Sequence, residues 1–154
     1  MKNKLTGQHI LATNRKARFN YFLSDFLEAG IELKGTEIKS LRLNGASLSD
    51  AYVMFKRGEA FIVNMHIAPY EHGNIFNHEP LRTRKLLLHA QEIRKFLGKT
   101  KEKGFTVLPT KVYLSHGRAK IEIALGKGKK LYDKRETIKQ RDIERDIRKA
   151  DKNF

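Results

Sequence analysis

The chain has 154 residues, with 32 Lys and Arg against 17 Asp and Glu, so its net charge at pH 7 is +15. This length supports one domain with one core, and so basic a chain points to nucleic acid or another acidic surface as a partner. The absence of cysteine excludes disulfides, thiolate zinc sites and cysteine nucleophiles. No apolar run approaches the ~20 residues of a membrane-spanning helix, and no secretory signal precedes the domain. We therefore expect a cytoplasmic protein without a membrane partner.

The first third of the chain predicts a basic arm, a strand and a short helix. Residues 1–18 carry five Lys or Arg and no acidic residue, which predicts a mobile arm up to about Gly7. Apolar alternation over 19–27 indicates a strand or a short helix, and Gly30 suits a bulge or turn. Thr36 is expected to cap a short helix that ends at Asn44-Gly45.

The middle of the chain predicts a hairpin followed by a long loop. Residues 48–68 alternate on both sides of Arg57-Gly58, a typical two-residue hairpin turn. Residues 69–85 contain proline, glycine and histidine and end in a basic cluster formed by Arg82, Arg84 and Lys85. Long loops in compact domains are often functional.

The last third of the domain predicts a short strand, a helix and a long hairpin. Residues 86–88 form a short buried strand, and the apolar spacing over 90–97 predicts a helix. The strand over 105–114 is interrupted at Pro109, which indicates an edge or a bulge. Alternation over 118–125 predicts a strand with isoleucines inward and Arg118, Lys120 and Glu122 outward.

Together these elements predict a mainly β fold. About six short antiparallel strands, with two or three short helices, favour a closed OB-like barrel over an open sheet, because closure removes exposed strand edges. We place this domain at residues 1–126. Barrels of this kind commonly bind nucleic acid.

Residues 127–154 form a basic tail with 11 Lys and Arg against six Asp and Glu and few apolar residues. Ile143 and Ile147 have helical spacing, but an isolated helix of this length is marginal in water. The tail is therefore either a disordered solubilising segment or a segment that becomes ordered on RNA.

Other candidate sites are weaker. His66, His72 and His78 lie six residues apart, whereas zinc sites usually use closer pairs or cysteines, so we expect no metal site. The stretch 126–130 is glycine- and lysine-rich but lacks the phosphate-loop spacing, which favours a flexible basic hinge. Arg118 and Lys120 are either solubilising residues or, with the arm and the basic cluster at 82–85, a phosphate-binding surface; the net charge favours the second interpretation.

Several segments resemble a known family. They read NRKAR at 14–18, GTEIKSLR at 35–42, LSDAYV at 48–53, RTRKLLL at 82–88 and DKR at 133–135. In this order they closely resemble the small protein B family, the tmRNA-binding proteins of bacterial trans-translation.

The resemblance implies a function and two partners. It implies a monomeric OB-like barrel that binds the tRNA-like domain of tmRNA and is delivered with it to stalled ribosomes. It also implies a tail that is disordered when free and helical in the mRNA channel, near the decoding centre and 16S rRNA. Such a protein is not an enzyme and needs no cofactor.

The resemblance also assigns residues to the two partners. For RNA binding it implies Asn14, Tyr21, Glu28, Leu87, His89 and Lys120. For the ribosomal decoding centre it implies Lys127, Gly128, Lys130, Tyr132, Asp133, Lys134 and Arg135. A ribosomal or assembly protein, which would share the charge and the tail, is one alternative function. An RNA-processing enzyme is another, although no acidic metal cluster supports it.

Overall fold

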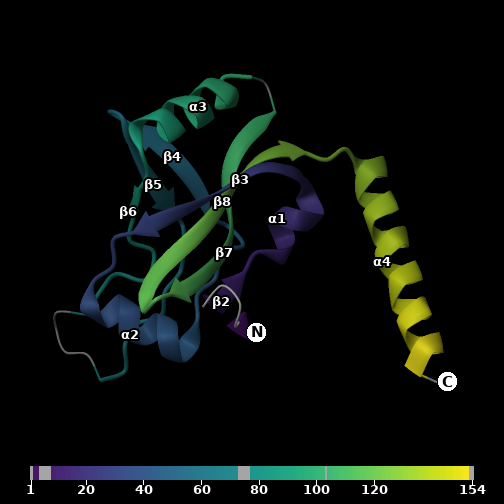
Figure 1. Cartoon of the computed structure of the whole chain (residues 1–154), viewed down its shortest axis with the longest axis horizontal. Coiled ribbons are helices and arrows are strands. Elements are labelled where there is room, and N and C mark those ends of the chain that lie inside the picture. The colour runs from purple at the N-terminus through teal and green to yellow at the C-terminus, as the bar shows by residue number, and fades with distance from the viewer. Residues whose placement is uncertain (1, 4–7, 73–76, 103, 153–154) are drawn as a thin grey trace.

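The computed structural model describes residues 2–3, 8–72, 77–102 and 104–152. These residues form eight strands and four helices (Figure 1). The strands are β1 (Lys2–Asn3), β2 (Gln8–Thr13), β3 (Tyr21–Ile31), β4 (Tyr52–Lys56), β5 (Glu59–Val63), β6 (Arg84–Leu87), β7 (Phe105–Ser115) and β8 (Arg118–Gly128). The helices are α1 (Arg15–Asn20), α2 (Gly35–Asn44), α3 (Ala90–Thr100) and α4 (Leu131–Lys152).

Six of the strands close into a barrel. The strands β7, β4, β5, β6, β3 and β8 pair in that order, and β8 pairs again with β7. Outside this ring, β2 pairs with β7 and β1 pairs with β2. All described pairings are antiparallel. The predicted closed antiparallel barrel of about six strands is confirmed, as are the short helices.

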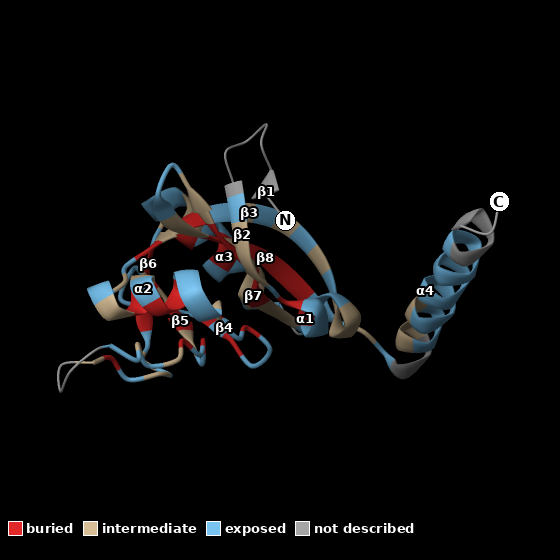
Figure 2. Ribbon diagram, turned by 90° about the horizontal axis from the view of Figure 1, so that it is seen from below, coloured by how far each residue is buried: buried red, intermediate tan, exposed pale blue. Residues whose placement is uncertain are grey.

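Aliphatic side chains fill the barrel, and two helices close its ends. Ile121 and Ile123 of β8 are fully buried, which confirms the alternation predicted for this strand. Ile93 and Phe96 anchor α3 at one end, and Leu41 anchors α2 at the other (Figures 1 and 2). Successive side chains of a strand point to opposite sides of the sheet. The residues of β3 and β8 that alternate with the buried ones therefore form an outer face that is open to a partner.

The predicted hairpin turns are confirmed by their backbone angles. Arg57 and Gly58 have φ of 53° and 76°, and His116 and Gly117 have φ of 50° and 78°. Two successive positive values match the twist of antiparallel strands. At Pro109 the register shifts relative to β8. Since β7 pairs along both edges, Pro109 marks a bulge and not an edge strand.

The N-terminal segment is more ordered than its composition predicts. Residues 4–7 lie outside the described part of the chain, so the mobile arm predicted there stays a prediction. Residues 8–13, however, pair with β7 as strand β2. The apolar stretch over 19–27 contains a helix end and a strand start, since α1 ends at Asn20 and β3 begins at Tyr21.

Two local predictions were wrong. The bulge in β3 lies between Ser24 and Leu27, where Asp25 has φ of 53°, and Gly30 is a regular strand residue. Thr36 lies inside α2 and does not cap it. Instead the Glu37 carboxylate accepts the Lys34 backbone N–H at 2.8 Å, which satisfies one of the free donors at the start of the helix.

The basic cluster at 82–85 does not form one phosphate-binding surface. Arg84 is fully buried and donates to the buried Glu37 carboxylate, to the Met65 carbonyl at 2.7 Å and to the Pro80 carbonyl at 3.2 Å. Arg82 donates to the same carboxylate at 2.6 Å. Arg84 therefore holds the loop before β6 onto α2, a role that its sequence neighbours do not indicate.

The tail begins later than the predicted boundary. Strand β8 continues through Gly126 to Gly128, and Gly128 pairs with Tyr21 of β3. Helix α4 then extends away from the barrel (Figures 1 and 2). Residues 131–152 are helical in this structure, while the helix in the mRNA channel and the disorder of the free tail stay predictions.

Candidate nucleic-acid interface

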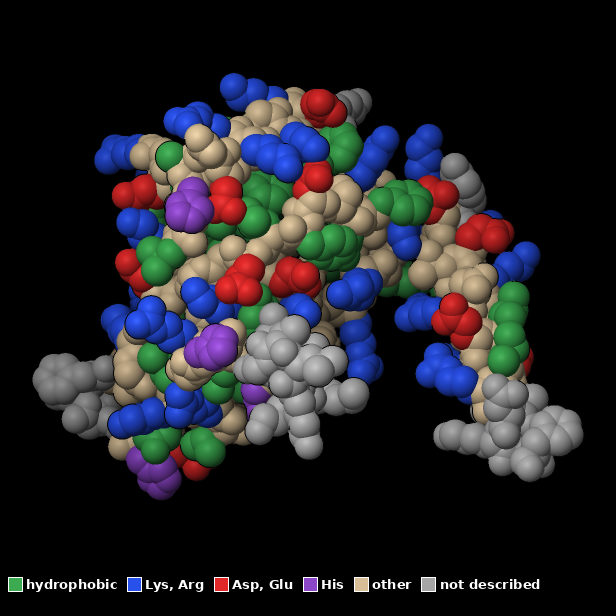
Figure 3. All heavy atoms as spheres, viewed as in Figure 1, with side chains coloured by type: hydrophobic (Ala, Val, Ile, Leu, Met, Phe, Trp, Pro, Cys, Tyr) green, Lys and Arg blue, Asp and Glu red, His purple; other side chains and the backbone are tan. Residues whose placement is uncertain are grey.

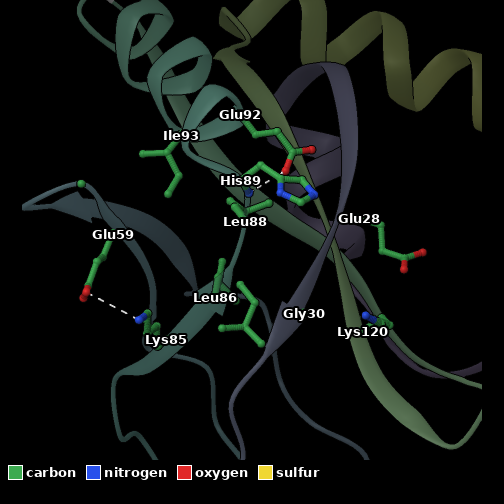
Figure 4. A pocket seen from close by; sticks show the side chains of 12 residues that line it. Glu28, Gly30, Glu59, Lys85, Leu86, Leu88, His89, Glu92, Ile93 and Lys120 are labelled. Carbon is green, nitrogen blue, oxygen red and sulfur yellow. Dashed lines mark hydrogen bonds and ion pairs between the residues drawn. The ribbon is translucent and has the colours of Figure 1, made fainter.

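Four of the residues expected to contact RNA line one open cavity of about 470 Å³ on the outer face of the barrel. They are Glu28 of β3, Leu87 of β6, His89 before α3 and Lys120 of β8. Figure 4 labels Glu28, His89 and Lys120 around the cavity. Strand β3 pairs with both β6 and β8, so three distant segments of the sequence meet here. We call this cavity the barrel cavity.

A glycine keeps the middle of the barrel cavity open. Gly30 pairs with Leu87 on one side and with Lys120 on the other. A Cβ atom at Gly30 would lie 3.1 Å from the Leu87 Cβ, closer than ordinary packing. Leu87 is 51% exposed, so its side chain offers an apolar surface on which an unstacked base can pack.

Glu28 is held by a buried tyrosine. The Tyr113 hydroxyl donates to Glu28 Oε2 at 2.7 Å. Burial raises the pKa of Tyr113, and the neighbouring Glu28 raises it further, so the hydroxyl stays a donor at neutral pH. The Glu28 side chain is itself exposed, which leaves acceptor capacity for a partner.

His89 and Glu92 form the rim next to α3. The Glu92 carboxylate accepts the His89 backbone N–H at 2.8 Å, so it caps the helix. The His89 ring is exposed and points over the barrel cavity (Figure 4). This arrangement fixes the backbone of His89 and leaves its ring free to stack or to form hydrogen bonds.

The opposite rim was not predicted. There Lys85 lies 3.5 Å from the Glu59 carboxylate (Figure 4). Glu59 and Glu92 belong to a hairpin and a helix that are distant in sequence, and neither has a spacing that indicates a shared rim. Of the residues on this rim, only Lys85 was indicated by the sequence, as part of the basic cluster at 82–85.

Asn14 and Tyr21 do not line the barrel cavity. The Asn14 side chain is buried, donates to the carbonyls of Leu48 and Pro109 at 3.1 and 2.8 Å, and accepts the Ala17 N–H at 3.1 Å. Its polar atoms are thus used inside the fold. Tyr21 packs over Gly126, whose missing Cβ would lie 3.2 Å from the Tyr21 ring.

Basic residues at the end of the barrel lie over aromatic rings. The ammonium of Lys127 lies 5.7 Å from the Phe105 ring centre, and that of Lys129 lies 5.2 Å from the Phe22 ring centre. Phe22 is 52% exposed. Cations over exposed rings form a surface on which both phosphates and bases can bind.

Helix α4 meets α1 beside this surface. The Arg141 guanidinium lies 5.1 Å from the Phe19 ring centre. An open cavity of about 480 Å³ lies there, lined by Arg15, Arg18, Phe19, Thr137, Arg141 and Arg148. The sequence does not indicate these arginines as a set, because only the folded chain brings residues of the arm and the tail together.

The DKR stretch at residues 133–135 lies in the first turn of the tail helix. The Asp133 carboxylate accepts the Lys130 backbone N–H at 3.2 Å, and an acid in the first turn also suits the helix dipole. Lys130 and Arg135 are exposed and Lys134 is partly exposed. The side chain of Tyr132 lies outside the described part of the chain.

The loop histidines have structural contacts. The buried His78 ring lies 2.9 Å from Thr36 Oγ1 and 2.9 Å from the Ile67 carbonyl. His72 packs edge-on against Tyr70. Across the described residues, His, Asp and Glu form no group of three that could hold a metal ion. Nor does any described helix have the length and apolar character to cross a membrane.

A closed antiparallel barrel with an open cavity, exposed aromatics and a basic surface defines the class of OB-like nucleic-acid-binding proteins. The family model described as SmpB protein matches residues 11–153. The SsrA-binding protein of Caldicellulosiruptor bescii is 53% identical, covering 99% of this chain and 97% of that protein. That of Malacoplasma penetrans is 57% identical, covering 91% and 96%.

A solved structure supports the same family through its fold. A chain of the structure described as "tmRNA-SmpB: a journey to the center of the bacterial ribosome" superposes with a TM-score of 0.68 at 44% identity, covering 80% of this chain and 87% of that chain. The chain therefore belongs to the SmpB family of SsrA-binding proteins.

Proposed function

We propose that this protein binds the tRNA-like domain of tmRNA through the barrel cavity and delivers it to stalled bacterial ribosomes for trans-translation. The observation that carries the proposal is the convergence of Glu28, Leu87, His89 and Lys120 in one open cavity on an SmpB-family barrel. The relatives' name, SsrA-binding protein, and the tmRNA-SmpB structure support the same partner.

The barrel cavity offers a different contact to each part of an RNA loop. The exposed Glu28 carboxylate accepts hydrogen bonds from a base edge, and Lys120 meets a phosphate. Leu87 and the His89 ring pack against bases that have left their stack. A purely electrostatic binder would have no use for the carboxylate, so the mixture favours recognition of one RNA fold.

Asn14 acts indirectly in this proposal. Its buried amide joins the start of α1 to the bulge of β7, through the carbonyl of Pro109 and the N–H of Ala17. Asn14 thereby positions the α1 surface that carries Arg15 and Arg18. Tyr21 holds the end of β8, where the tail begins.

In this proposal the tail binds the ribosome. Lys127, Gly128 and Lys130 lead into α4, and Asp133, Lys134 and Arg135 form its first turn, with Tyr132 beside them. In the proposed complex this segment contacts 16S rRNA at the decoding centre, and α4 occupies the empty mRNA channel. The role is binding and delivery in the cytoplasm, without catalysis or a cofactor.

A reconstituted tagging reaction tests the proposal. A chain ending at Lys130 keeps all of β8 and the Lys129 N–H bond to the Asn20 carbonyl, so it should fold and bind tmRNA with unchanged affinity. It should nevertheless fail to tag a stalled peptide. In the full chain, alanine at Asp133, Lys134 and Arg135 should give the same separation of binding from tagging.

The matched control removes the same charges further along α4, with alanine at Lys139, Asp142 and Arg145, and should retain more tagging. Normal tagging by the shortened chain would refute the role of the tail. A ribosomal protein, the alternative function, would be present on every ribosome, so recruitment that does not depend on stalling would favour it.

A further inference from the structure

Two carboxylates lie directly opposite each other on the outer face of the barrel. Glu28 of β3 pairs with Glu122 of β8, so their side chains point to the same side of the sheet. Like charges in this position destabilise a sheet. Among the described ion pairs, neither carboxylate is joined to a cation. Lys111 of β7 pairs with Glu122 on the other side of β8, but it forms no described ion pair with Glu122. An acidic pair without an ion-pair partner among the described residues, beside an RNA-binding cavity in a chain of charge +15, requires a reason.

Each carboxylate is oriented by a buried hydroxyl of β7. Tyr113 donates to Glu28 Oε2 at 2.7 Å, and Thr110 Oγ1 donates to Glu122 Oε2 at 2.7 Å. Tyr113 is 2% exposed and Thr110 is fully buried. Thr110 is the extra residue of the β7 bulge, a feature that re-aims side chains. The two hydroxyls bind one oxygen of each carboxylate and so fix both side chains.

The chemistry of this pair selects its partner. An ionised carboxylate only accepts hydrogen bonds and repels phosphate. Its partner in RNA must therefore be a donor on a base edge. The Watson–Crick edge of guanine carries an imino and an amino donor side by side, which suits two fixed acceptors. Acidic and basic side chains are mixed over β3 and β8 on this face (Figure 3).

We propose that Glu122 and Glu28 together accept hydrogen bonds from the Watson–Crick edge of one unpaired guanine in the RNA, with Tyr113 and Thr110 as positioning residues. The inference rests on the proposed function and extends it, because Glu122 does not line the barrel cavity and has no role in the site described above. It identifies the class of base that is read at the edge of that cavity.

The sign of one mutational effect tests this inference. In the full chain, Glu122→Gln removes a negative charge, so generic electrostatics predicts equal or tighter binding to a polyanion. A base-reading role predicts weaker binding to the tRNA-like domain, by roughly tenfold, as for loss of one base-edge contact. Glu136→Gln, an exposed change in α4, is the matched control and should not weaken binding.

A second variant tests the positioning role. Tyr113→Phe keeps the buried ring and removes only the hydroxyl, so it should weaken binding when Glu28 is present and have no further effect in a Glu28→Ala background. If the role of Tyr113 were merely structural, Tyr113→Phe would lower the affinity for the RNA equally in both backgrounds. Thermal melts should show Glu122→Gln to be no less stable than the parent, because the change relieves like-charge repulsion.

The RNA provides the last arm of the test. Replacing each unpaired guanosine by inosine removes only the amino donor. At one position, inosine should lower the affinity of the parent chain for the RNA. The same replacement should not lower the affinity of the Glu122→Gln variant any further. If the parent prefers the tRNA-like domain over bulk tRNA and Glu122→Gln binds as tightly as Glu136→Gln, the two-carboxylate inference is overturned. If the parent shows no such preference, the proposed function itself fails.

Discussion

Lys120 and Ile121 are neighbours on β8 with opposite surroundings. Lys120 lines the barrel cavity, whereas Ile121 is fully buried in the core. Lys120→Ala should weaken binding to tmRNA with little change in the free energy of unfolding. Ile121→Ala should lower that free energy by about 2–5 kcal/mol, because it leaves a cavity in a close-packed core. Gel shifts and urea titrations of both variants measure the two effects. A larger loss of stability for Lys120→Ala would contradict the separation of the two faces.

Glu37 provides a residue-scale test that does not involve RNA. Burial raises the pKa of its carboxyl, but the hydrogen bonds from Arg82, Lys34 and Arg84 outweigh burial and hold the pKa below its ordinary value of 4.5. A lowered pKa in the folded state means that the stabilisation is complete above pH 4.5 and is lost as the pH falls through the folded value.

Glu37→Gln should therefore destabilise the protein at pH 7 by about 3–5 kcal/mol, because Arg84 is left buried without its counter-charge. The loss should shrink as the pH falls below 4.5 and through the lower pKa of the folded carboxyl, because the parent carboxyl then also becomes neutral. Urea unfolding at several pH values measures this difference. A difference that does not change with pH would contradict the account of the pair.

Single residues also mark the limit of prediction from sequence. Ile121 was assigned to the core from alternation alone, because a strand with one buried face has a period of two. The clustering of Arg84 with other basic residues in a chain of charge +15 favours a phosphate-binding surface, but the structure buries Arg84. Its partner Glu37 lies 47 residues away, and nothing in the local pattern indicates the pairing.

At the scale of elements, turns were more predictable than boundaries. The hairpin turns at Arg57-Gly58 and His116-Gly117 each contain a glycine, which adopts positive φ without steric cost. The end of β8 is set instead by pairing with β3 and by Tyr21 packing on Gly126, which are non-local contacts. The four residues of the barrel cavity are also brought together by non-local contacts. The family resemblance indicated each of them, but only the fold showed that they lie together.

Helix α4 should be weakly stable in the free protein. It contacts α1 near Phe19, and the two views show most of its length clear of the barrel. An isolated helix of this kind is marginal because nucleation is costly. Amide hydrogen exchange should therefore be fast over 131–152 and slow over β8. Asp133→Ala should reduce the helical population further, since it removes the cap on the Lys130 N–H. Protection of α4 equal to that of β8 would contradict this account.

At the scale of the whole molecule, a closed barrel holds two candidate RNA-binding surfaces at separate places, one of mixed charge and one basic. The barrel cavity lies among β3, β6, α3 and β8, while the arginine-lined cavity lies between α1 and α4. Barrel closure leaves no long strand edge in the ring, so the outer face of β3 and β8 is available to a partner. In the proposed function, the net charge of +15 supplies attraction to any RNA, whereas the shape and the carboxylates of the barrel cavity supply selection.

The affinity of the full chain for the tRNA-like domain of tmRNA, compared with bulk tRNA at matched salt, tests the central claim most directly. Both affinities should fall with salt, by roughly 0.7–0.9 log units per log unit of salt for each phosphate neutralised. At every salt concentration the tRNA-like domain should bind more tightly than bulk tRNA. Lys120→Ala should reduce the difference between the two affinities. Equal affinity for the two RNAs across the salt series would contradict the account and leave a generic basic RNA binder.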